Sequence, residues 1–208
     1  MGQYFDGFRA LPPYGIAGFW VILLYVIQSE IRFGAKARSH RRGESDRGST
    51  VALSIAALVP VLGFALAMKA AASSWIPHWF RDASLPGMPA VAWVGVAVAA
   101  SGLVVRIWAV LTLRERYTRT LLTQDGQAVE RRGPYRWVRH PGYLGSMLCL
   151  NGLAMASGNY VVLIASLAAT FAAYAHRIRV EDEMLLQAFG ESYAVYRRAV
   201  AAVIPFLR

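Results

Sequence analysis

Long apolar stretches, each bounded by charged or turn-forming residues, are the feature that most limits what this chain can fold into. Three of them cover residues 14–31, 50–72 and 88–113. A helix needs about 20 consecutive apolar residues to cross the hydrocarbon core of a bilayer, so these lengths are typical of transmembrane helices. The composition agrees, because 56% of the 208 residues are hydrophobic and only 16% are charged. We therefore predict an all-α integral membrane protein with a single membrane domain over residues 1–208.

A fourth apolar stretch, residues 143–175, is too long for one crossing. The turn-forming residues Ser157, Gly158 and Asn159 interrupt it near its middle. We predict a helical hairpin of residues 143–157 and 159–175, which brings the total to about five transmembrane helices. Each half is short for a full crossing, so the hairpin is expected to be tilted or to dip into the bilayer.

The chain is strongly basic, with 22 Lys and Arg against 12 Asp and Glu. On a soluble surface this excess would indicate nucleic-acid binding, but the basic residues lie in the segments between the apolar stretches. Six fall in residues 32–49, seven in 114–140 and five after residue 174, whereas 73–87 holds only Arg81. This asymmetry follows the positive-inside rule and predicts an outside N-terminus, a cytoplasmic C-terminus and contact with anionic lipids, not with nucleic acid.

Few residues inside the predicted helices are polar. Gly95, Ala99 and Gly102 put small side chains on one face of the third helix, which favours close helix packing. Arg106 is interpreted as snorkelling to the interface, with a functional role as the alternative. The single cysteine, Cys149, is expected to be a small buried hydrophobe, and no metal site is predicted.

The loop before the hairpin holds the densest set of polar and turn-forming residues. Gly133-Pro134-Tyr135 is followed by Arg139-His140-Pro141-Gly142-Tyr143 and then Gly145. The glycine and proline steps interrupt regular helix, and the tyrosine rings suit a membrane interface. One interpretation is a basic interfacial loop with an aromatic belt. The other is an irregular backbone that lines a pocket at the membrane surface.

This motif resembles that of the isoprenylcysteine carboxyl methyltransferases and their bacterial and phospholipid-methylating relatives. A second block after the hairpin matches the C-terminal signature of the family: Glu181-Asp182-Glu183-Met184-Leu185, Phe189-Gly190, Tyr193, Tyr196 and Ile204-Pro205-Phe206. Two blocks in order, separated by a hairpin, make a specific signal, and they cover roughly the last 95 residues. The first three helices resemble the family only in hydropathy.

The resemblance implies S-adenosylmethionine as cofactor and a cytoplasmic pocket built by a loop over residues 120–145 and a C-terminal cytoplasmic segment over 176–208. It implies the following cofactor-binding residues: Gln127, Ala128, Val129, Glu130, Tyr135, His140, Pro141, Gly142, Tyr143 and Glu181. Arg177 is expected to face the methyl acceptor, so that Arg177 and Glu181 are the predicted catalytic pair. The bacterial relatives imply the inner membrane of a bacterium.

Independent reasoning from the residues leaves two alternatives for these positions. Arg177 and Glu181 are spaced i,i+4 and share one face of a helix leaving the membrane, but a surface pair in this order stabilises a helix by only about 0.3 kcal/mol. Stability is therefore a weak reason for their presence, although a purely structural pair is still the alternative. His140 is either a satisfied interfacial histidine or a cofactor contact.

The region expected to bind the methyl acceptor, here called the acceptor side, differs in sequence from that of the eukaryotic enzymes of the family. Where those enzymes carry a basic residue and then a proline after the second tyrosine, this chain has Ala199 and Ala201 after Tyr196. The acidic pair is Glu181-Asp182, not two glutamates. The chain is therefore not a close copy of a prenyl-protein enzyme on that side.

The predicted function is methylation of a lipophilic or lipidated acceptor at the membrane, with a carboxylate favoured. A phospholipid amine or a small thiol is the alternative acceptor. A membrane reductase of related architecture that uses NADPH is the second hypothesis, and a non-enzymatic scaffold that binds lipid is the third.

Overall fold

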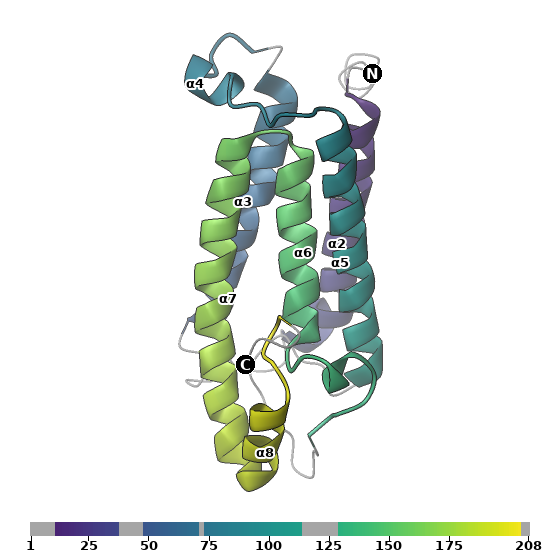
Figure 1. Cartoon of the computed structure of the whole chain (residues 1–208), viewed down its shortest axis with the longest axis vertical. Coiled ribbons are helices and arrows are strands. Elements are labelled where there is room, and N and C mark those ends of the chain that lie inside the picture. Colours follow the sequence, from purple (N-terminus) through teal and green to yellow (C-terminus); the bar gives the residue numbers. More distant parts are fainter. Residues whose placement is uncertain (1–10, 38–47, 71–72, 114–128, 205–208) are drawn as a thin grey trace.

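The computed structural model describes residues 11–37, 48–70, 73–113 and 129–204. Among these residues the chain is all-helical, and its only β-type contacts are two isolated bridges. Five long helices run alternately up and down the bundle (Figure 1): α2 (Pro13–Ala37), α3 (Ser49–Ala70), α5 (Ala90–Leu113), α6 (Pro141–Ala156) and α7 (Tyr160–Phe189). Three short helices lie at its ends: α4 (His78–Arg81), the 3₁₀ helix η3 (Gly133–Arg136) and α8 (Glu191–Ala199).

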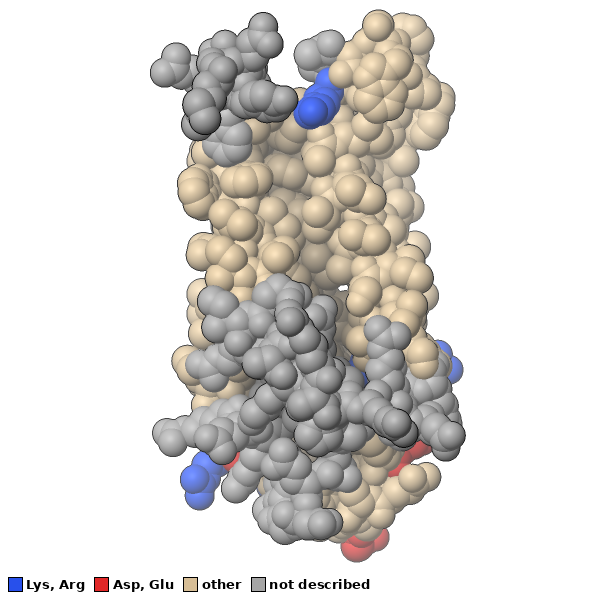
Figure 2. All heavy atoms as spheres, turned by 180° about the vertical axis from the view of Figure 1, so that it is seen from behind, with Lys and Arg blue, Asp and Glu red and all other residues tan. Residues whose placement is uncertain are grey.

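The bundle has the surface of an integral membrane protein. Within the described residues, α3, α5 and α7 are long and apolar enough to cross a membrane, and α2 contributes a shorter apolar helix over Pro13–Ser29. Large hydrophobic side chains such as Leu58, Val104 and Phe171 are exposed on the outside of the bundle. On the face that Figure 2 shows, charged side chains lie near the two ends, and the described residues visible between them are uncharged. We call this middle part, with its exposed hydrophobic side chains, the apolar band. Exposed apolar surface of this extent requires lipid as its solvent.

The predicted break in the fourth apolar stretch is confirmed, because α6 ends at Ala156 and α7 begins at Tyr160. Gly158 has a φ of 69°, a left-handed conformation that glycine adopts at little cost. The side-chain oxygen of Asn159 accepts hydrogen bonds from the backbone N–H groups of Val161 and Val162, and so caps α7. Its Nδ2 donates to the Phe80 carbonyl at 2.7 Å, which ties the hairpin turn to α4.

The helix of the second arm continues past residue 175, the predicted end of its membrane-spanning part. Helix α7 has 30 residues and is therefore about 45 Å long, whereas the hydrocarbon core is about 30 Å thick. The residues after Ala175 are rich in charged side chains and good helix formers, so the helix continues where the apolar stretch stops. The second half of α7, residues 175–189, thus continues past the apolar stretch and carries Arg177, Glu181 and Asp182.

The expected close packing of the small residues is confirmed at the contact of α5 with α6. A Cβ added to Gly102 would lie 2.4 Å from the backbone nitrogen of Cys149, and one added to Gly152 would lie 2.4 Å from that of Ala99. The two backbones touch, which only glycine and other small residues allow. Cys149 is buried in this contact, as expected.

The interpretation of Arg106 as a snorkelling side chain is wrong. Arg106 is only 8% exposed and lies between helices. Its Nε donates to Gln28 Oε1 at 2.9 Å, one Nη donates to Ser146 Oγ at 2.5 Å, and its guanidinium lies 5.1 Å from the centroid of the Tyr25 ring. Polar partners on α2 and α6 make a buried position favourable, and hydropathy alone could not reveal them.

Gly102→Val is expected to destabilise the bundle, because the added side chain would collide with the α6 backbone. Overpacking a tight contact costs about 1–3 kcal/mol, so thermal unfolding in detergent should occur at a clearly lower temperature than in the parent. Ala97→Val is the matched control, since Ala97 is exposed on the same helix. Equal unfolding temperatures for the two variants would contradict the backbone contact.

Candidate active site

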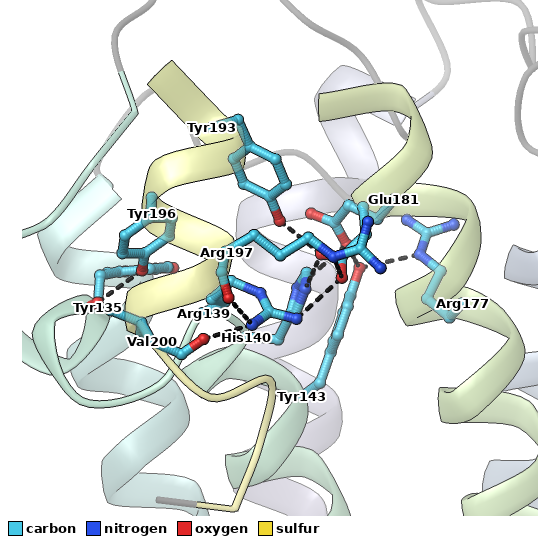
Figure 3. Close-up of polar contacts among 11 residues, drawn as sticks. Tyr135, Arg139, His140, Tyr143, Arg177, Glu181, Tyr193, Tyr196, Arg197 and Val200 are labelled. Carbon is cyan, nitrogen blue, oxygen red and sulfur yellow. Dashed lines mark hydrogen bonds and ion pairs between the residues drawn. The ribbon is translucent and has the colours of Figure 1, made fainter. Parts of the chain in front are cut away.

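The candidate site lies at the end of the bundle where α6 begins, α7 projects, and η3 and α8 meet them (Figure 1). Figure 3 shows its polar side chains converging from four elements and the segments beside them. They are Tyr135 on η3, Arg139, His140 and Tyr143 at the start of α6, Arg177, Glu181 and Asp182 on α7, and Tyr193, Tyr196 and Arg197 on α8.

The start of α6 explains how His140 and Tyr143 reach the site together. Pro141 occupies the first helical position, where its missing N–H and fixed φ suit a helix start. His140 precedes it in a non-helical conformation, as expected for a residue before proline. The imidazole stacks on the Tyr143 ring, with centroids 5.4 Å apart and planes 8° from parallel. Both rings therefore present their polar atoms to α7.

Asp182 is the most highly connected residue of the site. Its Oδ1 lies 2.8 Å from His140 Nε2 and accepts the Tyr193 hydroxyl, while its Oδ2 accepts from Arg139 at 3.0 Å. Arg197 Nε lies 3.7 Å from Oδ2. Since a carboxylate only accepts, the hydrogen between Asp182 and His140 belongs to the imidazole Nε2. One buried carboxylate thus joins α6, α7 and α8.

The surroundings shift the pKa values of this cluster in the directions that keep Asp182 charged. Burial by itself would raise the pKa of Asp182, but hydrogen bonds from His140 and Tyr193 and the charges of His140 and Arg139 hold it well below its usual range. Burial and the neighbouring Asp182 charge raise the pKa of Tyr193. Burial raises the pKa of Tyr196 to about 12. The tyrosines therefore stay protonated and donate, and Asp182 stays ionised and accepts.

A second chain of contacts starts from Glu181, the neighbour of Asp182. The Tyr143 hydroxyl donates to Glu181 Oε2 and accepts from Arg177 Nε at 2.9 Å. One Nη of Arg177 donates to Ser49 Oγ at 2.8 Å and to Thr50 Oγ1 at 3.0 Å. Arg177 and Glu181 thus lie on one face of α7, and Tyr143 bridges them.

The C-terminal segment, residues 190–202, covers the site through backbone contacts. The N–H groups of Arg139 and His140 donate to the carbonyls of Ala201 and Ala202 at 2.8 and 2.9 Å. The Tyr196 hydroxyl donates to the Tyr135 carbonyl at 2.6 Å. Because the Ala201 contact uses its backbone, the departure from the family pattern at that position leaves the contact intact.

Most of the predicted cofactor residues come to this end of the bundle, but two lie outside the described residues. Those two are Gln127 and Ala128. Glu130 accepts hydrogen bonds at 3.1 Å from the N–H groups of Arg131 and Arg132. The described predicted residues are Val129, Glu130, Tyr135, His140, Pro141, Gly142, Tyr143 and Glu181. Within the described chain, no three His, Cys, Asp or Glu side chains are grouped as metal ligands.

Sequence reasoning missed the roles of three groups. Asp182 and Tyr193 stand in the quoted C-terminal block, yet nothing in the block shows that they bind each other and His140. Arg139 stands in the first block, and its charge pairs with Asp182 across 43 positions of sequence. Nothing in the sequence indicated that Ser49 and Thr50 contact this site, because hydroxyl residues at a helix start usually cap that helix.

The comparison with known proteins bears on the same region. Residues 93–187 match the model of the Isoprenylcysteine carboxyl methyltransferase (ICMT) family. The predicted resemblance to the ICMT family is confirmed. The matched segment runs from α5 to near the end of α7 and contains His140, Tyr143, Arg177, Glu181 and Asp182.

Curated ICMT proteins are similar over about two thirds of this chain. Protein-S-isoprenylcysteine O-methyltransferase from Tribolium castaneum is 29% identical over 143 residues, which are 66% of this chain and 51% of that protein. The protein of that name from Xenopus laevis is 27% identical over 144 residues, 67% of this chain and 50% of that protein. The chain thus spans about half the length of these relatives.

A solved structure of the eukaryotic intramembrane Ras methyltransferase ICMT has a similar fold. The two structures superpose with a TM-score of 0.66 at 22% identity, over 94% of this chain and 68% of the other. The similarity therefore extends to the first helices, which resemble the family only in hydropathy.

Asp182→Asn is expected to loosen the C-terminal segment, because it removes the charge that His140, Arg139 and Tyr193 surround. Breaking a buried charge pair costs about 3–5 kcal/mol. Limited proteolysis should cleave the C-terminal segment much faster than in the parent. Glu191→Gln is the control, since the Glu191–Arg198 pair is exposed and contributes at most about 1 kcal/mol. Equal cleavage rates for Asp182→Asn and the parent would contradict the role of Asp182.

Proposed function

We propose that this protein uses S-adenosylmethionine to methylate a lipophilic acceptor at the membrane, and that the acceptor atom belongs to a carboxylate. The Arg177–Tyr143–Glu181 chain, which lies within the segment that matches the ICMT model, carries this proposal. The names of the curated relatives describe O-methylation of isoprenylcysteine. Because the chain spans half of their length, their activity is proposed for it and not assigned.

The donor side of the site offers groups that fit the cofactor. The Glu181 carboxylate is partly exposed, with 23% of its side-chain surface accessible, and suits the hydroxyl or cationic groups of the ligand. Arg139 Nε is a buried donor without a hydrogen-bond partner among the described residues, and a ligand acceptor would satisfy it. When bound, S-adenosylmethionine supplies an electrophilic methyl group. The residues proposed to hold it are Gln127, Ala128, Val129, Glu130, Tyr135, His140, Pro141, Gly142, Tyr143 and Glu181.

The acceptor side is proposed to depend on Arg177. A guanidinium stays charged at physiological pH, and it can bind and orient a carboxylate through charge-assisted hydrogen bonds. A carboxylate is already ionised at pH 7, so the protein needs only to align it and to exclude water. Arg177 is 1% exposed, which provides a water-poor environment for that contact.

An amine acceptor would place a different demand on the site, because a base must first remove a proton. Within the described residues the candidates are His140 and Glu181. The Nε2 hydrogen of His140 is committed to Asp182, which leaves the base role to Nδ1, 3.7 Å from Glu181 Oε2. The preference for a carboxylate therefore rests on Arg177 and not on the lack of a base.

The membrane arrangement is proposed as five helices with the N-terminus outside, the C-terminus in the cytoplasm and the site at the cytoplasmic face of a bacterial inner membrane. Helices α2 and α5 end, and α3 and α6 begin, at the end of the bundle that holds the site (Figure 1). The two basic loops connect these same helix ends, in agreement with the positive-inside rule. With 16 residues, α6 is about 24 Å long, so it crosses less than the full hydrocarbon thickness.

Arg177→Ala is expected to abolish turnover while the protein still binds S-adenosylhomocysteine, the product form of the donor. The measurement uses purified protein in detergent, labelled S-adenosylmethionine and an N-acetylated isoprenylcysteine, with calorimetry for product binding. Arg179→Ala is the matched control, because Arg179 is exposed two residues along the same helix. Retained turnover in Arg177→Ala would contradict its role.

Glu181→Gln is expected to weaken S-adenosylhomocysteine binding by roughly tenfold, because a hydrogen bond to a charged group contributes about 1.5 kcal/mol or more. Glu183→Gln, an exposed neighbour, should bind like the parent. Titration of NADPH against the same sample tests the reductase alternative. Binding of NADPH without S-adenosylhomocysteine binding would overturn the methyltransferase proposal.

A further inference from the structure

The first turn of α3 contacts the candidate site through two hydroxyl groups. Ser49 Oγ and Thr50 Oγ1 both accept from the same Nη of Arg177, which is 128 and 127 residues away in sequence. Ser49 is fully buried. Hydroxyl residues at a helix start usually accept from the first backbone N–H groups of their own helix. These two instead reach across the bundle to α7.

The contacts restrict the guanidinium from two sides. Tyr143 accepts from Nε, while Ser49 and Thr50 accept from one Nη. A guanidinium is planar, so hydrogen bonds to two of its nitrogens fix the plane and the direction of the third. These three hydroxyls orient the side chain and add no negative charge of their own.

We propose that Ser49 and Thr50 are positioning residues that hold Arg177 in the orientation in which it binds the carboxylate of the acceptor. This inference rests on the proposed function and deepens it, because it extends the acceptor site to α3. Ser49 and Thr50 act on the acceptor through Arg177, whose guanidinium both hydroxyls contact.

A merely structural bridge between α3 and α7 is the alternative, and the packing of the two helices argues against it. They contact each other along the bundle, and a Cβ added to Gly63 would lie 2.6 Å from a methyl group of Val162. The helices are thus held together by close packing far from the hydroxyl pair. Loss of the two hydroxyls should leave the fold intact and change the orientation of Arg177.

The test uses the full chain in detergent, with Ser49→Ala and Thr50→Val combined. Turnover is measured with labelled S-adenosylmethionine and an N-acetylated isoprenylcysteine, and the isoprenylcysteine carboxamide serves as an uncharged competitor. We expect kcat/KM for the acceptor to fall roughly a hundredfold, because two hydrogen bonds to a charged group are lost and each contributes about 1.5 kcal/mol. The preference for carboxylate over carboxamide should shrink, while S-adenosylhomocysteine binds as in the parent.

Two further variants separate positioning from folding. Ser54→Ala is the matched control, since the Ser54 hydroxyl donates to the Thr50 carbonyl on the exposed side of the same helix. It should behave like the parent. Ser49→Thr combined with Thr50→Ser retains both hydroxyls and should restore most of the activity. The double variant could lose activity because it unfolds at a lower temperature. In that case Thr50→Val, which lacks one hydroxyl, is compared with Thr50→Ser, which keeps it.

Each outcome decides a different point. An active parent whose acceptor kinetics and carboxylate preference are unchanged in the hydroxyl-free variants would overturn the positioning role and leave the proposed function intact. Equal loss of acceptor turnover and S-adenosylhomocysteine binding would also overturn it, since Arg177 is assigned to the acceptor alone. A parent that neither binds S-adenosylhomocysteine nor methylates the acceptor would overturn the proposed function and this inference with it.

Discussion

A buried carboxylate must be paired, and the pairing of Asp182 determines the geometry of the whole site. His140, Arg139 and Tyr193 reach it from the start of α6 and from α8. These contacts hold the C-terminal segment over the site and orient the His140 imidazole. The stacked Tyr143 ring is oriented with it, and this gives the hydroxyl that bridges Glu181 to Arg177.

The two neighbouring carboxylates of α7 therefore have different tasks. Asp182 is buried among donors and holds elements together, whereas Glu181 is partly exposed and belongs to the chain that ends at Arg177. The positions of these groups depend in turn on the backbone contact of α5 with α6, which fixes how closely α6 packs against α5. Close helix packing in the apolar band and a polar network beyond it thus act together.

Much of the fold was predictable because its signals are local. Apolar run length located the helices, Ser157 to Asn159 located the hairpin turn, and Gly95, Ala99 and Gly102 indicated the close contact with α6. Arg177 and Glu181 were expected on a helix leaving the membrane, and α7 carries both. Arg106 was misinterpreted, since its partners are distant in sequence. For the candidate site, the two motif blocks named the residues but not their contacts.

The sequence by itself determined the solvent and the helical class, which follow from composition, apolar run length and charge placement. The two motif blocks named the residues of the candidate site through their resemblance to the ICMT family. Only the tertiary structure decided that Asp182 pairs with His140, that Tyr143 joins Arg177 to Glu181, and that α3 contributes hydroxyls. Such contacts join residues up to 128 positions apart, and their distances depend on how the helices pack. No local pattern encodes that separation.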